Sequence, residues 1–468
     1  MNRKILAFLI LLGATLAGCT VGPEYQRPPL AAPEQFRGET GPAEAASFAD
    51  QAWWEVFDDE ALEGLIAEAL QNGYDIRLAA WRVEEARAAA GLARSQRFPA
   101  VQATAGWSRG RVAGVTEDLY DVNLGVAWEI DLWGRIRRLN EAARADVLAT
   151  EEARRGVLLS LVSEVATSYF QLRELDLELE IARRSAGTFQ ETYDLFNRRL
   201  KAGAASGLET ASAGATLAST QSVIPDLERL IVEEENRLSF LLGRHPGPVA
   251  RGAELADQLL PPEIPPGLPS DLLQRRPDLR EAEQRLVAAN ADVGVAAADF
   301  FPRLSLTGAL GGLAPEVEDL FGDGKTWSVG GGLLSPLFQG KRLQDQHRAA
   351  VARWEQEKVR YEASVTNAFA EVSTGLVTYQ KLAESEREQA RAADSYRQAV
   401  RLSNERYISG LADYLEVLQA QRQQLAAESS LARTRFDRLA SLVQLYKALG
   451  GGWRLADQEF ERNVATLP

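Results

Sequence analysis

The stretch YDVNLGVAWEI, residues Tyr120–Ile130, decides the fold, because large apolar residues alternate in it with polar or small ones. Side chains of a β-strand point to opposite faces in turn, so a period of two predicts a strand with one apolar and one polar face. Tilted membrane strands have about this length, ~9–11 residues. A soluble hairpin packed on helices would show the same alternation and stays an alternative.

Residues 101–108 show the same alternation and are predicted to be the partner strand, and residues 303–312 and 326–334 of the second copy show it more weakly because they are rich in glycine. Trp107 and Trp128 stand near strand ends, where aromatic anchors of membrane strands are found. Four strands cannot close a barrel, for which about eight is the smallest usual number, and an open sheet in lipid leaves its edges unpaired. The chain therefore either assembles with copies of itself, or it is not a membrane barrel.

A long proline-free segment follows each pair of strands, at residues 134–201 and 341–409. Each predicts one helix of about 100 Å, because an α-helix rises ~1.5 Å per residue. Gly203 and Gly410 then interrupt the helical pattern, and return helices are predicted to end near residues 242 and 449. Apolar residues in the long helices follow a heptad seam, namely Leu158, Val162, Val165, Tyr169 and Leu172, then Val365, Phe369, Val372, Leu376 and Tyr379.

The chain is predicted to be an internal duplication, because its patterns recur about 205 positions apart. The residues that recur 203 positions later are Asp75, Arg77, Ala79, Gly91, Phe98 and Pro99, while the heptad series, Arg199 and Gly203 recur after 207. The predicted parts are a signal peptide (1–18), an extended tether that is not a packed element (19–57), a first repeat (58–243), a Pro-rich linker (244–270), a second repeat (271–450) and a tail (451–468). The first repeat is expected to begin with one helix over residues 58–97.

The first residues indicate a secreted lipoprotein. Arg3 and Lys4 precede a short apolar core, and Leu16-Ala17-Gly18 leads to Cys19, the only cysteine of the chain. The apolar core is too short to span a bilayer, which takes ~20 residues, so it is interpreted as a cleaved signal. Cys19 is then expected to carry diacylglycerol and an N-acyl chain. Thr20, in place of an aspartate that retains lipoproteins at the inner membrane, favours the outer membrane.

Composition excludes several classes of function. The formal net charge is −14, which argues against a nucleic-acid partner because phosphate binding needs a basic surface. His245 and His347 are the only histidines, and neither has a second ligand at metal-site spacing. We therefore expect no catalytic residues, no metal site, no cofactor other than the covalent lipid, and no enzymatic activity.

Several motifs together resemble the outer-membrane efflux lipoproteins of the TolC-like family. They are Gly22–Pro28 after Cys19, then Trp53-Trp54 and Asp58, Trp128–Arg135, Arg275–Arg280 with Phe300–Pro302, Arg406–Gly410, Tyr414-Leu415 and Ala420–Arg422. The resemblance implies a mainly α protein with a small β part. Its long helical hairpins would form a periplasmic coiled-coil tunnel, and its two β-hairpins would give four strands to a trimeric, twelve-stranded outer-membrane barrel. It also implies a homotrimeric exit duct that docks to a periplasmic adaptor and to an inner-membrane transporter of RND type.

A duct of this kind needs a polar lumen and a gate at its periplasmic end. The polar strand residues expected in the lumen are Asp121, Asn123, Glu129, Gln102 and Thr104. The helix turns at Gly203 and Gly410 would form the tip that meets the adaptor. The gate candidates that the resemblance suggests are Leu415, Gln419, Asp413, Arg422, Leu208 and Ser212.

Gln419 stands where relatives often have an aspartate, so Asp413, with Arg422 as a partner, is the acidic candidate that remains at the gate. Leu415 as an ordinary seam residue and Asp413 as a helix N-cap are equally good interpretations. Two other functions also stay open. They are an outer-membrane channel for type I protein secretion, and a lipid-anchored coiled-coil scaffold with soluble hairpins.

Overall fold

A computed structural model describes residues 20–29, 32–39, 47–50, 59–112, 114–258, 260–261 and 264–451. The signal peptide 1–18, Cys19, Trp53-Trp54, Asp58 and the tail beyond residue 451 lie outside the described residues. The chain divides into two compact units. The sheet unit comprises residues 1–30, 80–153 and 278–364, and the helical unit comprises 31–79, 154–277 and 365–468.

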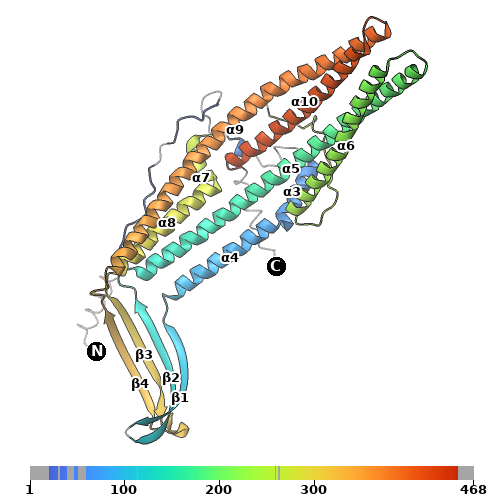
Figure 1. Ribbon diagram of the computed structural model, residues 1–468. Coiled ribbons are helices and arrows are strands. Elements are labelled where there is room, and N and C mark those ends of the chain that lie inside the picture. The colour runs from blue at the N-terminus through green and yellow to red at the C-terminus, as the bar shows by residue number, and fades with distance from the viewer. Residues whose placement is uncertain are drawn as a thin grey trace. The chain divides into compact units, whose positions relative to one another are not determined.

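The sheet unit contains the four predicted strands in one antiparallel sheet of order β1-β2-β3-β4 (Figure 1). The strands are β1 (Ala100–Val112), β2 (Val115–Ile130), β3 (Arg303–Ala314) and β4 (Lys325–Leu334). β2 and β3 belong to different repeats and pair from Tyr120–Ala314 to Ile130–Leu304. The two β-hairpins therefore form one continuous surface.

Two long helices follow the strands, as the absence of proline predicts. They are α5 (Arg135–Lys201) and α9 (Arg342–Ile408), each of 67 residues. The return helices α6 (Gly207–Leu241) and α10 (Tyr414–Ala448) each have 35 residues. Glycines with positive φ end the long helices, at +71° for Gly203 and +72° for Gly410, a backbone conformation that costs glycine little.

The structure corrects the single helix predicted over residues 58–97. The chain instead forms α3 (Glu60–Asn72) and α4 (Tyr74–Ser95), separated at Gly73. Gly73 has ψ 135°, and a Cβ there would lie 2.6 Å from the carbonyl oxygen of Ala69. Only glycine fits this turn, and sequence periodicity alone does not report so close an approach.

The second repeat matches the first in its main helices and differs at its start. α8 (Pro277–Ala298) has the 22 residues of α4 and begins 203 positions later. In place of α3 it has the short elements η2 (Pro269–Asp271) and α7 (Leu272–Arg275). Two further 3-10 turns are η1 (Phe48–Asp50) and η3 (Val317–Asp319).

The heptad series form the core of the helical unit. Val165, Tyr169 and Leu172 of α5 are fully buried, and Val372 and Leu376 of α9 belong to the same cluster. Residues of α3, α6 and α10 complete this cluster. The seam predicted from the sequence is therefore the packing face of both long helices.

The prediction that residues 19–57 are not a packed element is wrong for the described parts of that segment. Phe36 is only 3% exposed and its ring lies 6.3 Å from that of Phe369. Phe48 packs edge-on against Tyr446 at 5.7 Å. The segment has no long regular element, but its aromatic residues join the core of the helical unit, which its proline content did not indicate.

Candidate functional site

The four strands have one polar face, and the predicted lumen residues share it. Directly paired residues of neighbouring strands lie on the same face, and Gln102 pairs with Gly125 while Thr104 pairs with Asn123. The two-residue period then adds Asp121 and Glu129. Further residues that the register places on this face are Ser305, Thr307, Thr326 and Ser328. Whether this face lines a lumen stays a prediction.

Glycines accommodate the larger polar side chains of this face. A Cβ at Gly106 would lie 2.3 Å from Oδ1 of Asp121, and one at Gly311 would lie 2.4 Å from Oδ1 of Asn123. The carboxylate and the amide therefore lie over neighbouring glycines. This explains why β3 shows a weak alternation in the sequence: glycine is required where the polar residues of β2 are accommodated.

The opposite face of the sheet is apolar and exposed. Leu124 and Val126 of β2, Leu310 of β3, and Trp327 and Val329 of β4 all lie on it. The side chain of Trp327 is 79% exposed. A contiguous exposed apolar surface marks contact with a partner or with lipid.

A network of charges and aromatic rings connects β2 to α5. Glu129 accepts two hydrogen bonds from Arg135, both of 2.9 Å. Asp131 accepts from the backbone nitrogens of Ile136 and Arg137, which caps α5. Glu129 therefore lies on the predicted face, but its carboxylate is engaged at the junction rather than free.

Trp133 completes this junction from the first repeat to the second. Its ring stacks on Phe301 at 4.8 Å, and its Nε1 donates to the carbonyl oxygen of Pro302 at 2.8 Å. Motif residues 129–135 thus join β2, the start of α5 and the second repeat at this junction. The family resemblance indicated the motif itself. It did not indicate Phe301 and Pro302 as the partners of Trp133, because they lie far from it in the sequence.

The gate candidates lie where the return helices begin. Leu208 is 71% exposed and Leu415 is 46% exposed, each at the start of its return helix. Ser212 is half-buried and Gln419 is exposed. All four lie near the glycine turns, and their role in a gate stays a prediction.

Asp413 is the N-cap of α10, and its carboxylate accepts from the backbone nitrogen of Leu415 at 3.4 Å. Among the described residues, no ion pair joins Asp413 to Arg422, contrary to the predicted partnership. Nine helical positions separate the two residues, or ~13 Å along the axis, which is beyond the reach of an ion pair. The N-cap interpretation is therefore confirmed, whereas Asp413 and Arg422 do not pair within one chain and a pairing between chains stays a prediction.

The two hairpins hold each other near their turns through contacts that the sequence did not reveal. Arg199 of α5 donates to the hydroxyl of Tyr407 of α9 and lies 5.5 Å from its ring centroid. Phe196 and Tyr414 are buried with ring centroids 4.4 Å apart. These residues, with Phe189, Leu217 and Val417, form a small core of their own.

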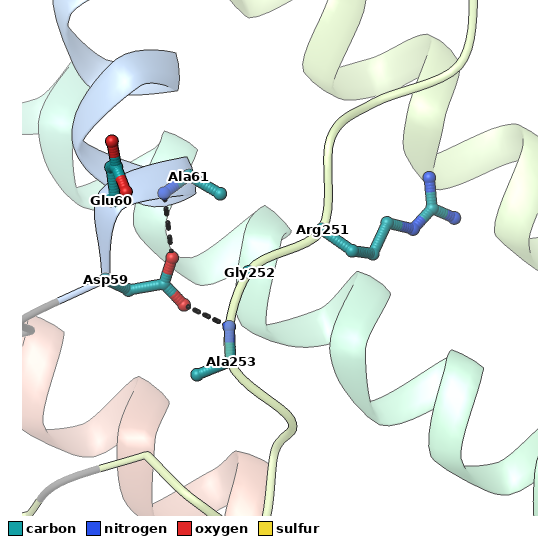
Figure 2. A pocket seen from close by; sticks show the side chains of 6 residues that line it. All are labelled: Asp59, Glu60, Ala61, Arg251, Gly252 and Ala253. Carbon is teal, nitrogen blue, oxygen red and sulfur yellow. Dashed lines mark hydrogen bonds between the residues drawn. The ribbon is translucent and has the colours of Figure 1, made fainter.

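A buried carboxylate, that of Asp59, holds the linker between the repeats and was not predicted from the sequence. Asp59 caps α3 by accepting from the nitrogens of Ala61 and Leu62, and Figure 2 shows its second oxygen directed to the nitrogen of Ala253. Its other donors are the hydroxyl of Tyr169 at 2.9 Å and Nε2 of Gln258 at 2.8 Å. Tyr169, Ala253 and Gln258 lie 110 to 199 residues away from Asp59, so no local pattern could reveal these three donors.

Glu174 is a second buried carboxylate outside every motif. Its side chain is 1% exposed on α5, and the nearest cation is Arg433 at 3.8 Å. Burial and the neighbouring carboxylate of Glu178 raise the pKa of Glu174 to about 8. Glu174 therefore holds its proton over much of the neutral range.

The described residues contain no helix that is both long and apolar enough to cross a membrane. Within the same part of the chain, no group of three or more His, Cys, Asp or Glu side chains is arranged to hold a metal ion.

Comparison with known proteins covers nearly the whole chain. Residues 65–244 and 268–451 match the family model described as outer membrane efflux protein. The chain is similar to the probable efflux pump outer membrane protein TtgC of Pseudomonas putida, with 37% identity over 97% of this chain and 96% of that protein. It is 34% identical to the cation efflux system protein CusC of Escherichia coli, over 96% and 99% of the two chains.

Solved structures show the same fold. The outer-membrane channel OprN superposes with a TM-score of 0.86 at 34% identity, over 93% of this chain and 100% of that one. Both halves of the duplication are therefore included in the similarity.

Proposed function

The chain belongs to the family of outer membrane efflux proteins, and from this premise we propose that it is the outer-membrane channel of a tripartite efflux pump. It would conduct small molecules passively from the periplasmic end to the exterior. The observation that carries the proposal is the four-stranded sheet with one polar and one exposed apolar face. The polar face is suited to a water-filled lumen and the apolar face to lipid.

The proposed assembly is a homotrimer, because the sheet ends in unpaired strands on both sides. In the described residues β1 pairs only with β2, and β4 pairs only with β3. Unpaired backbone groups in lipid cost several kcal/mol each, so the edges must be closed. Pairing β4 of one copy with β1 of the next would close a barrel of twelve strands from three copies.

The proposed partners would meet the chain at the glycine turns that end its long helices. TtgC is named as the outer membrane protein of an efflux pump and CusC as part of a cation efflux system. By analogy, this chain would dock through its Gly203 and Gly410 turns to a periplasmic adaptor and to an inner-membrane transporter of RND type. No cofactor and no enzymatic step are needed, and diacylglycerol with an N-acyl chain on Cys19 would anchor each copy.

Neither the fold nor the sequence identity to relatives determines which compounds this chain would transport. Toluene and cation efflux are both named among relatives of 34–37% identity. We propose that the transporter selects the cargo and that this chain provides the wall and the exit. Expression with different transporters would then change the exported compounds while this chain stays the same.

Conductance in a planar bilayer tests the duct and its gate together. The purified protein should give small, mostly closed currents. Leu415→Ala should raise them, because a ring of leucines at the start of α10 would narrow the pore. Val232→Ala, an exposed apolar residue well along α6, is the control and should change nothing. Unchanged conductance in Leu415→Ala would remove Leu415 from the gate, and absence of any current would contradict the duct.

A further inference from the structure

The N-terminal residues 20–28, here called the strap, are docked onto the sheet unit at specific sites. The backbone nitrogen of Val21 donates to the carbonyl oxygen of Trp133 at 3.0 Å. Thr20 lies so close to Gly134 that a Cβ on that glycine would be 2.7 Å from the threonine Cγ2. The strap therefore begins at the junction between β2 and α5.

The strap then follows one face of α8. Gly22 has φ +104°, and a Cβ on it would lie 2.5 Å from the Cα of Gly294. The buried Asn290 donates through Nδ2 to the carbonyl oxygen of Pro23 at 3.1 Å. Two backbones in direct contact and a buried amide are features of a specific interface, because both require matched positions.

A charged clamp holds the far end of the strap. Arg27 donates two hydrogen bonds to the carboxylate of Glu283, of 2.7 and 2.6 Å, and Tyr25 donates to the same carboxylate at 3.2 Å. Glu283 is buried, so the two-pronged pair is partly shielded from water. Glu283, Asn290 and Gly294 are seven and four positions apart, which places them along one side of α8.

We infer that the strap positions the lipid anchor, holding the acylated terminus beside the β2–α5 junction so that acyl chains and strands enter the membrane in a fixed register. This inference rests on the acylation of Cys19 in the proposed function. Adjacent residues are one Cα step of ~3.8 Å apart, so a group attached just before Thr20 is confined close to that residue. A flexible N-terminal segment would need neither the close contact between Gly22 and Gly294 nor the pairing of Arg27 with Glu283.

Hydrogen exchange tests the docking on the full chain. Glu283→Gln should weaken the clamp and speed amide exchange in the strap at least tenfold, and Gly22→Ala should do the same at Val21. Glu281→Gln is the matched control, because Glu281 also lies on α8 but pairs with Arg285 rather than with the strap. Equal exchange in Glu283→Gln, Gly22→Ala and the wild type would overturn the docking.

Insertion of six Gly/Ser residues tests the positioning of the lipid. Placed between Thr20 and Val21, the insertion frees the lipid from the docked strap. Placed between Pro29 and Leu30, it lengthens the same segment but leaves the strap beside the junction. We expect a several-fold loss of folded oligomer in the outer membrane only for the first insertion, with the lipid mass present in both proteins.

Equal yields from the two insertions would overturn the positioning role. A wild-type chain that lacks the lipid mass would contradict the acylation in the proposed function itself. The exchange experiment would still report whether the strap is docked, so the two failures can be told apart.

Discussion

The two helical hairpins have equal lengths and the same glycine turns, yet equivalent residues in them have different partners. In the second hairpin Arg406 pairs with Glu416 at 3.2 Å. In the first, Glu209 instead closes a capping box with Ser206, and the equivalent Arg199 reaches across to Tyr407. The N-cap residue is Ser206 in the first hairpin and Asp413 in the second. Because Glu209 bonds to Ser206, Arg199 is left to form the bond that joins the two hairpins.

The buried side chains of the hairpins differ in the same way. The rings of Phe196 and Tyr414 pack against each other between α5 and α10, whereas the residues 207 positions away from them are Ser403 and Gly207. Likewise, the buried Glu174 corresponds to the exposed Lys381. The duplication preserved the lengths of the helices, while single substitutions made the contacts between the copies asymmetric.

The largest expected effect comes from removing the aromatic contact between the hairpins. Phe196→Ala should lower the free energy of unfolding by about 3–5 kcal/mol, because it leaves a cavity beside Tyr414. Thermal unfolding followed by circular dichroism would measure the loss. Ser403→Ala, at the equivalent position of α9, is the control and should cost ~1 kcal/mol or less. A similar cost for both variants would show that the hairpins are energetically equivalent.

A pH-dependent effect should come from Glu174. Its folded pKa of about 8 exceeds the ordinary value of 4.5, so the folded state binds a proton that the unfolded state releases between these values. The contribution to stability is present below about pH 4.5 and is lost as the pH rises toward 8. Glu174→Gln should therefore raise the unfolding midpoint at pH 8, by the equivalent of at least ~1.4 kcal/mol, and leave it nearly unchanged at pH 4.5.

Lys381→Gln in the second repeat is the control for Glu174→Gln. Its side chain is exposed and pairs with Glu384, so its replacement should change stability by less than ~1 kcal/mol at either pH. A pH-independent effect of Glu174→Gln would show that Glu174 is ionised in the folded protein.

The smallest expected effects come from the two N-caps. Ser206→Ala should destabilise its hairpin by ~1 kcal/mol, since both bonds of the capping box depend on its geometry. Asp413→Ala should cost less, because its single bond is long, at 3.4 Å. Amide exchange in the first turns of α6 and α10 would measure both effects. A larger loss at Asp413 would reverse this ranking.

Features that depend on local periodicity could be predicted from the sequence, and features that depend on distant partners could not. The strands, the long helices and the polar face around Asn123 follow from alternation, absence of proline and the heptad seam. The break at Gly73 depends on a contact with one carbonyl oxygen. The three distant donors to Asp59, from Tyr169, Ala253 and Gln258, and the docking of Phe36 join segments far apart in the chain. Sequence spacing gave no indication of them.

The mass of the detergent-purified protein by native mass spectrometry tests the central claim most directly, since the channel depends on closing the open sheet edges with other copies. We expect three chains, each carrying the mass of its lipid, and no stable monomer with an open sheet. A folded monomer as the main species would contradict the closed barrel and with it the proposed duct.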